Sequence, residues 1–204
     1  MHLFIVPTGL GHTDCERVAD AALAQPVLAV TSLAFVVVGA MVLWSSIRGR
    51  GVLAVLAGLA AVAVGLGSFA YHGPQPSWAQ AAHDWPIVVL GAVCVTGLAR
   101  SRLVERRSVW AAAIGVFALG LIAYPAGRSA SPLCRPDSLW QYHGAWHVLA
   151  GAAAGLAAWA MITRRPVGAA ASPLPRAQAP GPPSSPPRPA DPTQAGCRED
   201  ESRW

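Results

Sequence analysis

The sequence predicts an all-α protein, a polytopic bundle of transmembrane helices. Hydrophobic residues make up 53% of the 204 positions and charged residues only 12%, whereas a soluble domain carries about 25% charged residues. The apolar residues gather in long runs, and a helix that spans a bilayer needs about 20 of them. The net charge of +5 comes from arginines clustered between these runs and in the C-terminal part. It therefore indicates membrane topology and not nucleic-acid binding.

Five apolar segments are expected to be helices, at residues 26–44, 52–71, 84–99, 109–125 and 140–162. The first, second and fifth segments are long enough to span a bilayer, and the fourth is marginal. The third is short and begins at Asp84, which is acceptable only where the helix start is buried in protein or faces a wet cavity. Small residues are frequent, as in GAAAGLAAWA at 151–160, and they suit close helix packing in lipid.

The arginines between the segments predict the orientation. They gather after the first, third and fifth segments, while the other two loops hold few basic residues. The positive-inside rule then places the N-terminus outside and the C-terminus in the cytoplasm. We expect an N-terminal extracytoplasmic segment at 1–25 and a transmembrane domain at 26–163. The proline-rich stretch at 164–204 is expected to be a disordered cytoplasmic tail.

Polar residues converge at the outer end of this predicted bundle. His72 ends the second segment, Asp84 begins the third, and His143 and His147 begin the fifth. The last two are four residues apart, so they share one face of a helix. Ser68 precedes His72 by one turn on the same face.

Three histidines beside a carboxylate and a hydroxyl are typical of a catalytic zinc site. Three protein ligands leave the fourth position open for water, which the metal activates at neutral pH. Asp84 is then expected to take and return a proton, and Ser68 to donate a hydrogen bond to the developing oxyanion. This set of groups predicts hydrolysis of an acyl bond.

Each of these residues also has a simpler interpretation. His72 alone would be an interfacial polar residue, Asp84 a helix N-cap and Ser68 a packing residue. His83 is a rival ligand beside Asp84, but its neighbours predict a loop. The convergence of several such residues on one side of the membrane favours the metal site.

Two other functions stay open. A histidine pair four apart also occurs in haem proteins, which makes a haem-binding electron-transfer membrane protein an alternative. Axial ligands must approach haem from opposite faces of the ring, whereas His143 and His147 share one face. A non-catalytic receptor-like or structural protein that keeps a metal for stability is the second alternative. His2 and His12 are expected at the surface.

Three motifs, in the same order along the chain, resemble those of alkaline ceramidases. They are GLGSFAYHG at 65–73, HDWP at 83–86 and QYHGAWH at 141–147. DCE at 14–16, followed by QPVLAVTSLAFVVVG at 25–39, is similar to the acidic stretch and first helix of that family. Alkaline ceramidases belong to a superfamily of membrane hydrolases that also includes the progestin and adiponectin receptors.

The resemblance implies a zinc ion held by His72, His143 and His147, with Ser68 and Asp84 at the site. It also implies an amidase reaction of sphingolipid metabolism, in which the N-acyl bond of a ceramide-like lipid substrate is cleaved.

The resemblance further implies a disulfide between Cys15 and Cys134. Asp14 and Glu16 match part of the stretch that binds calcium in eukaryotic relatives. Gln25 stands where an acid is expected, which weakens the case for Ca²⁺.

This chain also departs from the family. The family has seven helices and this sequence predicts five, and HDWP replaces a more acidic motif, which leaves the exact substrate open. The reduced size, the alanine-rich helices and the tail are typical of a bacterial plasma-membrane protein, with its site facing the extracytoplasmic side.

Overall fold

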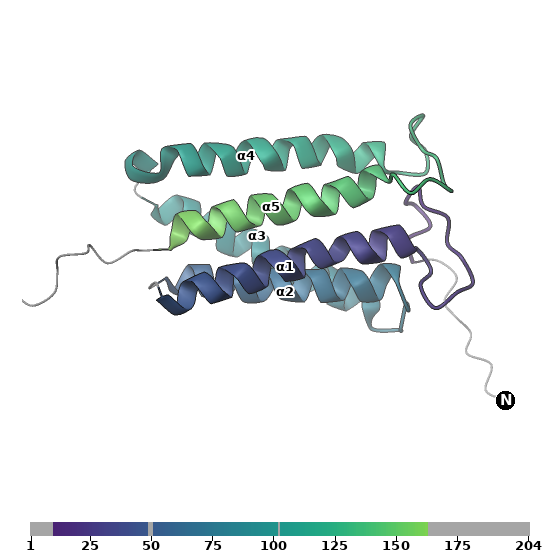
Figure 1. Ribbon diagram of the computed structural model, residues 1–204, viewed down its shortest axis with the longest axis horizontal. Coiled ribbons are helices and arrows are strands. Elements are labelled where there is room, and N and C mark those ends of the chain that lie inside the picture. Colours follow the sequence, from purple (N-terminus) through teal and green to yellow (C-terminus); the bar gives the residue numbers. More distant parts are fainter. Residues whose placement is uncertain (1–9, 49–50, 102, 163–204) are drawn as a thin grey trace, which may run out of the picture. The chain divides into compact units, whose positions relative to one another are not determined.

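A computed structural model describes residues 10–48, 51–101 and 103–162 of the chain (Figure 1). Within these residues the fold is all-helical, as the sequence predicts. Each helix is long and apolar enough to cross a membrane. The five helices are α1 (Pro26–Arg48), α2 (Val52–His72), α3 (Ala79–Arg100), α4 (Leu103–Ala126) and α5 (Tyr142–Met161). The predicted tail at 164–204 lies outside the described residues.

Helices α3 and α4 both begin before their predicted starts, and α4 begins at Leu103 and not at residue 109. The start of α3 bears on the site. This helix begins at Ala79 and not at Asp84, and Trp78 occupies the N-cap position. The expected loop position of His83 and the N-cap interpretation of Asp84 are therefore both wrong. The segment Ala-Gln-Ala-Ala-His before Asp84 is not apolar, but alanine and glutamine have high helix propensity. The helix consequently extends beyond the apolar run, and it is long enough to span the bilayer.

Helix α5 packs against all four other helices. In Figure 1 it lies between α4 and α1. Its buried face consists almost entirely of glycine and alanine, apart from the two histidines. The facing side of α2 is similarly built from small residues. Small side chains let helix backbones approach closely in lipid, where apolar burial alone does not drive association.

A glycine and a proline bring the start of α3 against α2. A side chain at Gly67 would collide with the backbone carbonyl of Ala82. That carbonyl lacks its usual helical donor, because the residue four positions later is Pro86, which has no N–H. The absence of a side chain at Gly67 therefore allows the segment that carries His83 to lie close to Ser68.

The N-terminal segment, residues 10–25, covers the end of the bundle where α1 begins, α2 ends and α5 begins. We call this segment the cap. Cys15 forms a disulfide with Cys134 in the α4–α5 loop, which confirms the pairing that the resemblance implied. Figure 1 shows the cap in purple and this loop in green at the same end of the helices. Exposed Arg17 adds a bidentate ion pair with Asp137 of the same loop.

Candidate metal centre

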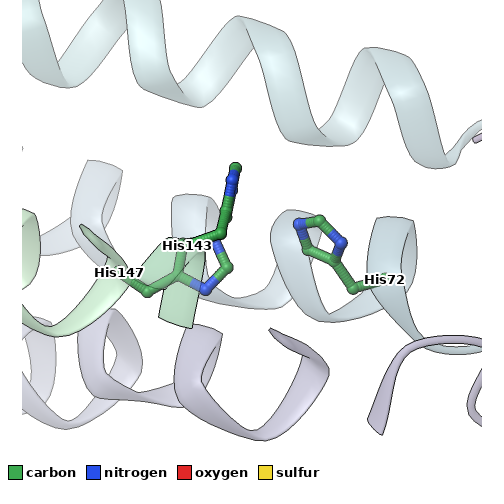
Figure 2. Close-up of side chains that lie close together, drawn as sticks. All are labelled: His72, His143 and His147. Atoms are coloured by element: carbon green, nitrogen blue, oxygen red, sulfur yellow. The ribbon is translucent and has the colours of Figure 1, made fainter. Parts of the chain in front are cut away.

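The three histidines named from the sequence lie together. His72 comes from the last turn of α2, and His143 and His147 come from the first turns of α5. One ring nitrogen from each lies within 4.8 Å of the others, and all three side chains are buried. Figure 2 shows His143 and His147 on one helix, with His72 beside them on another.

Two of the imidazoles are oriented by groups on or beside α1. The Nδ1 atom of His72 lies 2.8 Å from Oε1 of buried Gln25. The Nδ1 atom of His147 lies 3.2 Å from the Thr31 hydroxyl and 3.4 Å from that of Ser32. Both hydroxyls donate to backbone carbonyls of α1, so their lone pairs face the imidazole. In both histidines Nδ1 is thus the protonated nitrogen, which leaves Nε2 as the lone-pair donor.

The donor set fits a divalent metal ion. The Nε2 atom of His72 is buried and has no hydrogen-bond partner among the described groups, which is rare for a buried polar atom and needs an explanation. Neutral imidazoles are good ligands for zinc and for neighbouring transition metals. Three imidazole nitrogens within 4.8 Å of one another could contact a single ion of this kind.

Asp14 is a buried carboxylate at this site that the sequence assigned to a different role. Its Oδ1 lies 3.1 Å from Nδ1 of His143, and its Oδ2 lies 3.9 Å from Nδ1 of His72. Arg128 of the α4–α5 loop donates to the same Oδ1 at 2.8 Å. Burial acts to raise the pKa of the Asp14 carboxyl, but the neighbouring imidazoles and the Arg128 guanidinium outweigh it and hold that pKa below its usual range.

Glu16, the other acid matched to a calcium stretch, holds the start of α1. Its two carboxylate oxygens each accept a hydrogen bond, from the backbone N–H groups of Val27 and Leu28, at 2.8 Å. Burial raises the pKa of Glu16, against the effect of these two donors. Gln25 donates to the backbone carbonyls of Gly11 and Glu16. The oxygens suggested for calcium therefore already have protein partners.

Asp84 reaches the site only through its neighbour. Its side chain is 57% exposed and lies 2.7 Å from Nδ1 of His83. The His83 ring stacks on Tyr71 and lies 6.1 Å from the His72 ring, measured between centroids. From the sequence His83 was a rival metal ligand, set aside because its neighbours predict a loop, whereas it lies in α3. Its place beside Asp84 was the one available signal.

An apolar cavity of about 390 Å³ adjoins the histidines, and α2, α3, α4 and α5 form most of its wall. Ser68, His83 and His147 line one end of the cavity. Leu98 of α3, Trp110 of α4 and Ala157 of α5 line it further from the histidines. The backbones of α3 and α4 do not approach each other closely, and side chains of both helices line the cavity. Val95 and Ile114 are cavity residues that are also exposed, so the cavity opens to the outer surface of the bundle.

Comparisons of the chain with family models, with curated proteins and with solved structures find no match.

Proposed function

We propose that this protein is a zinc-dependent membrane hydrolase that cleaves the N-acyl bond of a ceramide-like lipid. The observation that carries the proposal is the buried histidine cluster at one end of an apolar cavity inside a bundle of membrane-spanning helices. A buried donor set beside a space with apolar walls suits a substrate that has a polar reacting bond and a hydrocarbon chain.

His72, His143 and His147 would hold the zinc ion. When bound by three imidazoles, zinc supplies a Lewis acid and an activated water at neutral pH. The residues around it position the substrate. Ser68 is buried at the cavity wall, where its hydroxyl can donate to the oxyanion that develops from the amide carbonyl.

Proton transfer falls to the His83–Asp84 pair. Asp84 accepts from Nδ1 of His83 and leaves Nε2 of that ring to exchange a proton, while His83 itself lines the cavity. The amide nitrogen must gain a proton as the carbon–nitrogen bond breaks, and a positioned imidazole can provide it. Water adds across the bond, so the products are a fatty acid and a free amine.

The role proposed for the cavity is to orient the acyl chain of the lipid. The cavity does not have to remove that chain from water. A membrane lipid already lies in an apolar medium, so burial of its chain gives little net driving force. The opening between α3 and α4 instead offers a lateral route from the bilayer, because exposed apolar residues border it. Binding then restricts the chain and places its amide beside the histidines.

The active site is proposed to face the extracytoplasmic side of a bacterial plasma membrane. Disulfides persist in oxidising compartments, and Cys15–Cys134 lies at the histidine end of the bundle. Arg48 and Arg100 end α1 and α3, at the ends of these helices opposite the histidines. Arg106 and Arg107 lie near the start of α4. The positive-inside rule requires such a distribution for this orientation.

The haem alternative is disfavoured by the crowding of the rings. A macrocycle must fit between its two axial imidazoles, and the three ring centroids here are only 4.9–5.5 Å apart. Each imidazole occupies the space that a macrocycle between the other two would need.

The test is fatty-acid release from N-acyl lipids by the detergent-purified, zinc-loaded protein, followed by mass spectrometry. Ceramides of several chain lengths should release fatty acid, and release should stop in His147→Ala. Equal release by wild type and His147→Ala, or no release from any N-acyl lipid, would contradict the proposal.

A further inference from the structure

All three histidines have an Nδ1 neighbour from one short stretch of the chain, the cap and the start of α1. The Nδ1 neighbour of His72 is the Gln25 side chain, and that of His147 is the Thr31 hydroxyl. Both of these side chains are neutral. The neighbour of His143 is a carboxylate, that of Asp14. A carboxylate behind a metal-bound imidazole acts differently from an amide or a hydroxyl, because its charge strengthens the ligand.

Asp14 is held in place from several directions. Its side chain is only 3% exposed, and Arg128 fixes one of its oxygens. The next residue, Cys15, donates its backbone N–H to the Gly127 carbonyl at 2.8 Å and carries the disulfide. Gly127 in turn packs so closely on the backbone of His143 that a side chain there would collide with it. The carboxylate is thus fixed relative to the imidazole by backbone, ion pair and covalent bond.

We infer that Asp14 is the positioning residue for His143, accepting its Nδ1–H so that Nε2 is presented to the metal. This inference rests on the proposed zinc site. The two atoms lie at hydrogen-bond distance, although without hydrogen-bond geometry, so the inferred hydrogen bond requires the imidazole to turn about its Cβ–Cγ bond. Arg128 donates to the same carboxylate oxygen at 2.8 Å and holds it beside the ring. The cap therefore contributes a charged group to the metal centre as well as covering it.

The experiment measures zinc affinity by competition with a chromophoric chelator, on the full-length protein in detergent. Asp14→Ala removes both the acceptor and the charge, and the expected result is an affinity about 10–100-fold weaker. Asp14→Asn keeps an acceptor oxygen without the charge, and it should recover part of the loss. The visible absorption of bound Co²⁺ should shift in Asp14→Ala, since the ligand field of His143 changes.

Asp137→Asn is the matched control. Asp137 is exposed and joins the same cap to the same loop through Arg17, but it does not contact a histidine among the contacts of the described residues. It should leave zinc affinity and the Co²⁺ spectrum unchanged. Titration of free thiols should show the Cys15–Cys134 disulfide intact in every variant, which separates a local effect from loss of the fold.

The outcomes distinguish this inference from the proposed function. Wild-type affinity in Asp14→Ala, or equal weakening in Asp14→Ala and Asp137→Asn, would overturn the role of Asp14 and leave the hydrolase proposal standing. A protein that binds zinc with the expected order of affinities but releases no fatty acid would support the inference and overturn the hydrolase. A wild type without zinc affinity would overturn both.

Discussion

Single side chains decide the chemistry at the histidine end of this bundle, and most of them are residue types that are usual at zinc sites. His72, His143 and His147 were identifiable from the sequence because a histidine in an apolar segment needs a reason to be there. Asp14 was not identifiable as their neighbour. Its contacts join the cap to positions more than fifty residues away, and no local pattern encodes such a contact.

Ser68 offers the simplest test of transition-state stabilisation. Ser68→Ala removes one hydroxyl from the cavity wall and should lower kcat about 10²–10³-fold, as expected for loss of an oxyanion donor. Zinc content should stay at the wild-type level, because Ser68 is not among the clustered ligands. Steady-state kinetics with a ceramide, paired with metal analysis, measure both quantities. A variant with unchanged kcat would assign Ser68 to packing.

The His83–Asp84 pair is expected to act as a unit. His83→Gln and Asp84→Asn should each reduce turnover strongly, and the double variant should be little worse than His83→Gln alone, since Asp84 contacts the cavity only through His83. Groups that act together give such non-additive losses. Independent, additive losses in the double-variant cycle would mean that Asp84 acts directly.

At the scale of elements, small residues decide where the helices pack closely. Glycine and alanine line the buried sides of α2 and α5, and this pattern predicted close helices. The true start of α3 was not predicted, because Ala79–His83 carries no large apolar side chain and Trp78, at the N-cap, is not a usual capping residue. Its place depends on the tertiary fit of Gly67 against Ala82, which hydropathy does not report.

Gly67→Val tests this fit. The new side chain would meet the Ala82 carbonyl, a rigid backbone group, so the free energy of unfolding should fall by about 1–3 kcal/mol. Gly91→Val is the control, because a Cβ at Gly91 meets nothing within 4 Å. Unfolding titrations with SDS in mixed micelles compare the two. Equal effects would show that the α2–α3 approach is not tight.

Glu16 tests the start of α1. Glu16→Ala leaves two backbone N–H groups without their acceptors and should lower the free energy of unfolding by about 1–2 kcal/mol. Asp20 lies in the same cap but is exposed, and Asp20→Ala should have almost no effect in the same SDS titration. If the two variants were equally stable, the capping role of Glu16 would be refuted.

For the whole molecule, the sequence was sufficient for the fold class and for the five helices of the described residues, but not for the cavity. Long apolar runs predict spans directly. The cavity forms because the backbones of α3 and α4 pack on other helices and not closely on each other, a property of the assembled bundle. The disulfide came from the family resemblance, and the structure places its two cysteines in the cap and in the α4–α5 loop.

The orientation of the molecule in the membrane can be measured with a membrane-impermeant maleimide. Ser77 is exposed in the α2–α3 turn, at the histidine end of the bundle. In a Cys94→Ser background, Ser77→Cys should be labelled in intact cells, whereas native Cys197 in the predicted tail should be labelled only after permeabilisation. The reverse pattern would place the histidines on the cytoplasmic side.

The central claim is that three histidines from two helices hold one metal ion, and metal analysis of the detergent-purified protein tests it most directly. We expect about one zinc per wild-type chain, and loss of that zinc in each of His72→Ala, His143→Ala and His147→Ala. His12→Ala, at an exposed residue outside the cluster, should keep it. A wild-type protein without zinc, or stoichiometric zinc that persists in the His72→Ala variant, would contradict the account.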